Sequence, residues 1–177
     1  MVNESYPWKR DLLKRKQLIE KYNRVEHLSE CDNDRVYTTI EKSIFYSAFI
    51  IRKLIDCKVK VSNEVDNYKF TLKGFKTLTH MDLMHRWPDE KTHDWKLVST
   101  YTVKGNEICN WLIHSFVFCL GYNESGRIDN FFVSSDKDKN KILYCVDLND
   151  WIAYMDFVGH DYVVAIDMHY ETESGNE

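Results

Sequence analysis

The sequence predicts an α+β fold in which long N-terminal helices pack with a small, mainly antiparallel sheet and a C-terminal helix. Apolar residues recur at three- and four-residue steps between positions 35 and 57, which is the period of a helix. Farther along the chain they alternate with polar residues in short runs, as in half-buried strands. Hydrophobic residues make up 44% of the 177 residues, enough for one core, and the scarcity of Gly (6) and Pro (2) leaves no evident linker. We therefore expect one globular domain over residues 1–170 and a flexible acidic tail over residues 171–177.

Two helices are expected before the first strand. The first covers residues 8–27 and has a narrow apolar stripe that would lie over the core. Its basic side chains either contact phosphates or form a solvated face: Lys9, Arg10, Lys14, Arg15 and Lys16. The second covers residues 35–57, follows cap-forming residues at 31–34, and has a stripe wide enough to make it the central element.

The strands are expected from runs of alternating residues. These runs cover residues 68–75, 96–103, 116–122, 128–136, 141–148 and 162–170. The third, fourth and fifth runs are joined by short turns, one with Gly126 at a positive φ, so they predict an antiparallel meander. Asn149 or Asp150 is expected to cap a short helix over residues 151–161 that Gly159 ends.

Composition excludes several classes of protein. The formal net charge of −4 gives no global electrostatic footprint for nucleic acid, although a local basic patch is not excluded. The 5 cysteines show no metal-binding spacing, which is typical of reduced thiols in a cytoplasmic protein. The N-terminus has no apolar signal region, and no apolar run reaches the roughly 20 residues that span a bilayer. We expect a cytoplasmic protein without a membrane partner.

The sharpest local feature is a polar pair in an otherwise apolar helix expected over residues 103–116. Asn110 and His114 are four residues apart in NEICNWLIHSF, so they share one face. The adjoining face is apolar and should pack inward. A histidine that titrates near neutral pH can give or take a proton, and an amide beside it can fix its tautomer or bind a phosphate oxygen.

The hexapeptide CNWLIH resembles a degenerate form of the motif of the HEPN superfamily (higher eukaryotes and prokaryotes nucleotide-binding domains). That motif is Arg, a polar residue that is often Asn, three further residues and His. Asn110 and His114 match it, whereas Cys109 stands in the Arg position and cannot supply a fixed positive charge. Active members are helical ribonucleases and toxins, so the resemblance implies RNA cleavage without a metal or other cofactor. The expected strands are not part of that family's helical core, and the pattern CN-x-x-IH is also similar to small bacterial proteins of no known activity.

Three interpretations of this helix remain open. In the first, the chain is a small binding or accessory protein of prokaryotic or phage type, and the motif is a relic or a ligand contact; its partner would be a protein, an RNA or a second copy in a homodimer. In the second, it is a metal-independent ribonuclease or toxin in which His114 is the general acid/base, Asn110 holds phosphate or orients His114, and a basic residue such as Arg52 replaces the missing Arg. In the third, His114 is a buried, hydrogen-bonded structural residue.

Other candidate sites are weaker. His80, His85 and His93 lie near carboxylates and are metal-ligand types, but their spacing matches no known site, and a solvated loop is the simpler interpretation. Asp136 and Asp138 lack the glycine and final glutamate of a calcium loop and indicate a hairpin turn. Since no P-loop, dinucleotide-binding or nucleophile-elbow motif is present, the corresponding nucleotide, redox and hydrolase chemistries are not expected.

Overall fold

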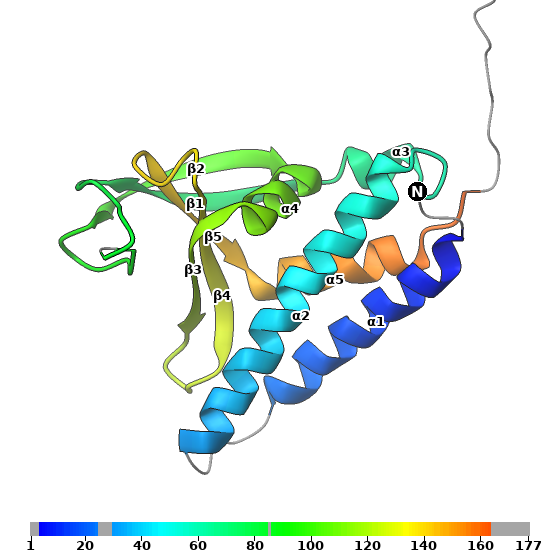
Figure 1. Cartoon of the computed structure of the whole chain (residues 1–177), viewed down its shortest axis with the longest axis horizontal. Helices are drawn as coiled ribbons and strands as arrows, with labels where there is room; N and C mark the ends of the chain where they lie inside the picture. Colours follow the sequence, from blue (N-terminus) through cyan, green and yellow to red (C-terminus); the bar gives the residue numbers. More distant parts are fainter. Residues whose placement is uncertain (1–3, 25–29, 85, 164–177) are drawn as a thin grey trace, which may run out of the picture.

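We describe the protein from a computed structural model that covers residues 4–24, 30–84 and 86–163. Five strands form one antiparallel sheet in the order β2-β1-β5-β4-β3 (Figure 1). The elements, in chain order, are α1 (Ser5–Tyr22), α2 (Glu30–Asp56), α3 (Asn63–Asp66), β1 (Lys69–Thr77), β2 (His93–Lys104), α4 (Gly105–Ile113), β3 (Ser115–Tyr122), β4 (Ile128–Ser135), β5 (Ile142–Asp147) and α5 (Leu148–His160). The predicted α+β class and the meander of β3, β4 and β5 are confirmed.

The main core lies between the sheet and the helices on one of its faces (Figure 1). The alternating residues Phe70 and Leu72 of β1 are buried toward this core, together with the apolar stripe of α2. Trp151 of α5 is fully buried, and its indole N–H donates to the Ser47 hydroxyl of α2 at 3.0 Å. This bond satisfies the polar edge of a large apolar side chain and fixes α5 against α2.

A smaller core covers part of the other face of the sheet. It contains Phe75, Met81, Val117 and Leu143, of which Met81 comes from the connection between β1 and β2. The backbone N–H of Met81 donates to the Asn140 side chain at 2.7 Å, which fastens this connection to the turn between β4 and β5. The sheet therefore has apolar packing on both faces, although the helices of the described residues lie on one face (Figure 1).

Two predicted helix starts were wrong. The long helix α2 begins at Glu30, so residues 31–34 belong to the helix instead of preceding it. Helix α5 begins directly after β5, where Asp147 is the N-cap and its carboxylate accepts from the backbone N–H groups of Asn149 at 2.8 Å and Asp150 at 3.2 Å. Because all three residues are good caps, the sequence alone did not decide among them.

The predicted stop at Gly159 was also wrong. Gly159 lies inside α5, where a Cβ would come within 2.5 Å of the Leu13 side chain of α1. The absence of a side chain at Gly159 therefore allows α1 and α5 to approach each other closely, and it does not end α5. Gly126, in contrast, has the expected positive φ of 75° in the turn between β3 and β4.

Some expectations fall outside the described residues. The strand predicted over residues 162–170 is described only at 162 and 163, which have no regular structure, and the predicted tail at 171–177 is not described. No helix among the described residues is both long and apolar enough to cross a membrane.

Candidate functional site

Asn110 and His114 line the same cavity, which we call the α4 cavity. It is an open depression of about 610 Å³ between the end of α4 and the turn that joins β4 to β5. Its lining residues are Glu107, Asn110, Trp111, His114, Ser135, Asp136, Lys137, Asp138 and Tyr144. The polar pair singled out by its helical spacing therefore faces an accessible space.

Contacts to three other elements hold the beginning of α4 in place. The backbone N–H of Gly105 donates to the Tyr68 carbonyl at 2.9 Å, which ties α4 to the residue before β1. The Glu107 carboxylate accepts from the backbone N–H of Lys104 at 2.7 Å and so caps the helix. Arg52 of α2 donates to the Asn106 side chain at 2.7 Å. These bonds fix the direction in which the far end of α4 presents its polar face.

His114 sits at the junction where α4 passes directly into β3. Its backbone N–H donates to the Asn110 carbonyl at 3.0 Å, and its own carbonyl accepts from Asp136 at 3.0 Å. The backbone is thus fixed on both sides, whereas the imidazole is exposed and makes no hydrogen bond with any described residue. The interpretation of His114 as a buried, hydrogen-bonded histidine was wrong, because its helix ends at the surface and only the main chain is used for structure.

Aromatic rings form one wall of the α4 cavity. Trp111 and Tyr144 stack with their centroids 3.9 Å apart and their planes within 4° of parallel. Tyr101 of β2 meets Tyr144 edge-on at 5.5 Å and 85°. Burial, with help from the negative charges of Asp138 and Glu107, raises the pKa of Tyr144 to about 12, so its hydroxyl remains protonated near neutral pH. The lining therefore contains two stacked rings and a protonated phenol hydroxyl.

The turn between β4 and β5 also lines the cavity, and its carboxylates are bonded to neighbouring side chains. The Ser135 hydroxyl donates to the Asp138 carboxylate at 2.8 Å, and Lys139 bonds Asp136 at 2.7 Å. Lys141 lies 3.7 Å from Asp138. Lys137 is the one cationic side chain among the residues that line the cavity, against three carboxylates. The lining is therefore acidic, although neighbouring lysines neutralise part of its charge.

Cys109 and Arg52, the other residues of the predicted site, lie apart from the α4 cavity. Cys109 is fully buried, and burial raises the pKa of its thiol far above the ordinary value, so it is neutral and inaccessible. Arg52 is near Cys109 but is held by Asn106 and by Asp56, whose carboxylate lies 3.1 Å from its Nε. In α4, Asn106 is eight residues before His114, which is roughly 12 Å along a helix axis.

The three histidines considered for a metal have different surroundings. His80 is exposed in the connection between β1 and β2, whereas His93 is 1% exposed at the start of β2. His85 lies outside the described residues. Within residues 4–24, 30–84 and 86–163, no three His, Cys, Asp or Glu side chains are grouped so as to hold a metal ion.

Sequence reasoning missed the aromatic wall. Tyr144 belongs to a run of alternating residues that predicts only a strand, and Trp111 lies within an otherwise apolar helix. The pattern around Asp136 and Asp138 indicates a turn, but their place in the same cavity as Asn110 depends on the pairing of β3 with β4, which no local pattern reveals. A useful signal would have been the helical wheel, on which His114 lies between Asn110 and Trp111, away from the face that holds Cys109.

The rings and carboxylates of the α4 cavity favour the binding of a cationic ligand over a reaction with a polyanion such as RNA. A π surface and carboxylates attract cations and hydrogen-bond donors, and an exposed imidazole with an adjacent amide adds a donor and an acceptor. Comparison with models of protein families, with curated proteins and with solved structures finds no match to this chain.

Proposed function

We propose that this protein is a small binding or accessory protein, and that its α4 cavity takes a basic segment of a protein partner. The observation that carries this proposal is that the stacked pair of Trp111 and Tyr144 lines one cavity together with three carboxylates and with Asn110 and the exposed His114. An arginine or lysine side chain can lie over an aromatic face and reach a carboxylate at the same time.

Charge favours this ligand class over RNA. Binding to a nucleic acid depends on Lys and Arg side chains that neutralise phosphates. The lining of the α4 cavity offers Lys137 against Glu107, Asp136 and Asp138. The same groups attract a cationic peptide, and the preformed stack reduces the conformational entropy lost on binding.

An NMR titration tests this proposal. The probes are short blocked peptides that contain two arginines, with counterparts in which glutamate replaces each arginine. We expect the arginine peptides to shift the signals of the Trp111 indole and the His114 imidazole in a saturable way, and the glutamate peptides to leave them unchanged. Asp136→Asn and Tyr144→Leu should each weaken binding about fivefold or more, whereas Glu124→Gln, which changes an exposed carboxylate in another turn, should not.

Equal responses to both peptide sets, or none, would refute the basic-segment proposal. A second copy of the chain is the competing occupant. Sedimentation of the parent protein and of Tyr144→Leu distinguishes it, because a dimer formed through this cavity should dissociate when the aromatic stack is removed.

The metal-independent ribonuclease is the second proposal, and it rests on the accessibility of His114 beside Asn110, Ser135 and Lys137. In that reaction His114 takes the proton of an RNA 2′-hydroxyl, whose oxygen attacks the adjacent phosphorus while the bond to the 5′-oxygen breaks and that oxygen takes a proton from water. Lys137 is better placed than Arg52 to face the phosphate, because Arg52 does not line the cavity.

An RNA cleavage assay in EDTA decides between the two proposals. Cleavage that is lost in both His114→Ala and Lys137→Ala, with melting unchanged, would establish the ribonuclease. Cleavage that persists in His114→Ala would come from a contaminant and leave the binding proposal as the better account.

A further inference from the structure

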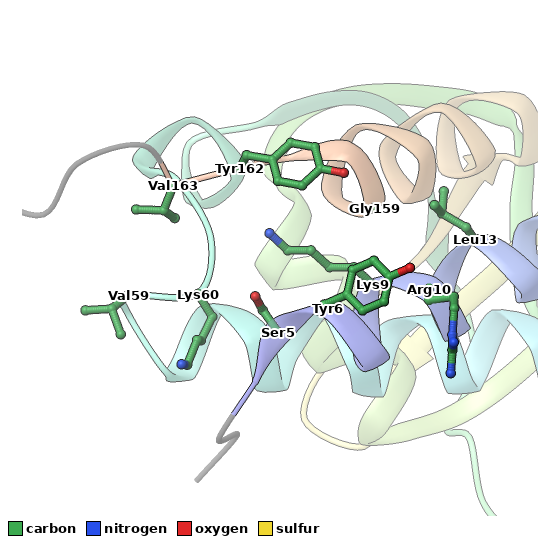
Figure 2. Close-up of a pocket in the computed structure, with 10 residues that line it drawn as sticks. All are labelled: Ser5, Tyr6, Lys9, Arg10, Leu13, Val59, Lys60, Gly159, Tyr162 and Val163. Carbon is green, nitrogen blue, oxygen red and sulfur yellow. The ribbon is translucent and has the colours of Figure 1, made fainter.

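The strand β2 is one of the two edge strands of the sheet, at the side away from β3 (Figure 1). No described residue of β2 lines the α4 cavity. Nor does β2 line a second cavity of about 370 Å³ between the start of α1 and the end of α5, which we call the α1 cavity and whose lining includes Tyr6, Lys9, Lys60 and Tyr162 (Figure 2). A partner that pairs with the edge of β2 is therefore independent of the function proposed for the α4 cavity.

The ladder between β1 and β2 shows which backbone groups of β2 point outward. The backbone N–H of Gly105 donates to the Tyr68 carbonyl at 2.9 Å, and the register continues without a shift from Lys104 to Val98. In an antiparallel ladder, every second residue bonds with the neighbouring strand, and the residues between them direct their N–H and C=O groups away from it. The outward residues of this regular stretch, which we call the open edge, are Val98, Thr100 and Thr102.

Two carboxylates end the open edge. The Asp94 carboxylate accepts from the backbone N–H of Lys96 at 3.1 Å, and the Glu107 carboxylate accepts from the backbone N–H of Lys104 at 2.7 Å. Lys96 and Lys104 are the next outward positions on either side, so another strand cannot use their N–H groups without displacing a carboxylate. The open edge is therefore centred on Thr100 and ends at the same distance on both sides.

The side chains along the open edge favour pairing with another strand. The run LVSTYTV, residues 97–103, contains no charged residue, Gly or Pro and is rich in β-branched residues. Leu97 is 62% exposed and Val98 is 46% exposed, and Ser99, Thr100 and Thr102 are exposed as well. Edge strands of soluble proteins commonly carry a charge, a Pro or a bulge that prevents such pairing. The middle of this run has none of them.

The other edge strand, β3, is covered. Its residues before Tyr122 are all at least partly buried. Tyr37 of α2 hydrogen-bonds with the backbone of Leu120. The Phe118 ring packs against the Phe45 ring of α2, with the ring centroids 4.7 Å apart. Helix α2 thus protects β3, and β2 is the edge that remains available to a partner.

We propose that β2 pairs with β2 of a second copy of this chain, antiparallel and with Thr100 on the two-fold axis. In this register Val98 of one copy lies opposite Thr102 of the other, and Thr100 lies opposite Thr100 of the other copy. Every N–H and C=O group of the open edge then has a partner, because outward residues meet outward residues. A register shifted by two residues would instead place part of the open edge opposite the occupied N–H of Lys96 or Lys104.

The side chains that meet in this register are complementary. Leu97 of one copy lies opposite Val103 of the other, so a largely exposed apolar side chain gains an apolar neighbour. Each end of the joint holds two lysines and two carboxylates, so its charge is balanced. These groups are Lys96 and Asp94 of one copy and Lys104 and Glu107 of the other.

Sedimentation of the whole protein tests this proposal. We expect the parent to be a dimer at about 100 µM that dissociates on dilution. Thr100→Pro removes an N–H that the single chain does not use, and should weaken the dimer about tenfold or more. Thr100→Ser, which keeps this N–H, is the matched control. Tyr144→Leu should leave the dimer intact, which separates it from a dimer formed through the α4 cavity.

An exchange of charge at the same position tests the register. Thr100→Lys and Thr100→Glu each bring like charges together at the two-fold axis, so each alone should weaken the dimer about fivefold or more. An equimolar mixture of the two variants should restore association. Because residue 100 is exposed, both variants should melt like the parent at a dilution where the parent is also a monomer.

Three results would each overturn the proposal. The first is a parent that stays monomeric at about 100 µM. The second is a dimer that Thr100→Pro and Thr100→Lys leave intact. The third is a mixture of Thr100→Lys and Thr100→Glu that associates no better than either variant alone.

Discussion

The two cavities combine aromatic rings with charges of opposite sign. In the α4 cavity the rings are stacked on each other, and neighbouring lysines partly neutralise the carboxylates. In the α1 cavity, which lies between the start of α1 and the end of α5, the rings of Tyr6 and Tyr162 are largely exposed, and Lys9 is paired with the Asp161 carboxylate. The linings of two cavities in one small acidic protein can thus differ in the charged residues that they contain, because net charge says little about a local lining.

The cavities also differ in how their residues are brought together. Asn110, Trp111 and His114 are neighbours in and directly after one short helix, so local spacing alone was enough to suggest a site. Tyr6, Lys60 and Tyr162 come from three segments separated by more than fifty residues each, and only the packing of α1 with α2 and α5 joins them. A site whose residues are far apart in the chain cannot be recognised from a short sequence motif.

The largest effect is expected from restoring the arginine of the HEPN-like motif. In Cys109→Arg a charged side chain would replace a fully buried thiol in the main core. Uncompensated burial of a charge should reduce the free energy of unfolding by about 4 kcal/mol or more, measured by urea denaturation. Cys109→Ala is the control and should cost about 1 kcal/mol. A stable Cys109→Arg protein that gains RNA cleavage would instead make the α4 cavity a site for anions and remove the contrast in charge.

The next effect concerns the ion pair under the α1 cavity. Lys9→Met leaves the Asp161 carboxylate buried, and the hydrogen bond from the backbone N–H of Ser62 is then the one polar contact that it keeps with the part of the chain that the structure describes. Breaking such a pair should reduce the free energy of unfolding by about 3 kcal/mol. The double variant Lys9→Met/Asp161→Asn should recover part of the loss, because the unpaired charge is gone. An additive pair of losses in this double-mutant cycle would show that the two groups do not interact in solution.

The smallest expected effect is a pH dependence of the stability of the fold that comes from His93. His93 lies in neither cavity; its Nδ1 is 3.0 Å from the Thr92 hydroxyl, and its buried Nε2 has no hydrogen-bond partner among the described residues. Burial lowers its pKa below the ordinary value of 6.5, and the facing carboxylate of Asp89 only partly opposes this. The unfolded chain therefore takes up a proton first as the pH falls. Stability should be full above about pH 6.5 and should decline as the pH falls through the lowered pKa of the folded state.

Melting curves between about pH 7.5 and about pH 5 measure this effect. The pH dependence should flatten in His93→Gln and persist in His114→Gln, since His114 is exposed. A pH dependence that His114→Gln removes would instead couple the α4 cavity to the stability of the fold.

Much of the fold could be predicted from local patterns in the sequence, whereas the sites could be predicted less well. The alternation of Phe70 and Leu72 and the stripe of α2 predicted their elements, because burial on one face imposes a period on the sequence. Helix ends were less certain, as Asp147 shows, because adjacent residues cap equally well. The surroundings of His114 were not predictable, since they depend on which strands pair and which turn lies opposite. The prediction at Gly159 was wrong because a glycine that permits a close helix contact looks the same in a sequence as one that ends a helix.

The parallel stack of Trp111 on Tyr144 gives the α4 cavity an optical reporter of its own. Two π systems held 3.9 Å apart and nearly parallel should give a chiral signal in the near-ultraviolet circular dichroism spectrum. A guest that inserts beside the rings or tilts one of them changes that signal without any label. Occupancy of the α4 cavity can therefore be followed by near-ultraviolet circular dichroism, with Tyr144→Leu as the variant that should lose the signal of the stack.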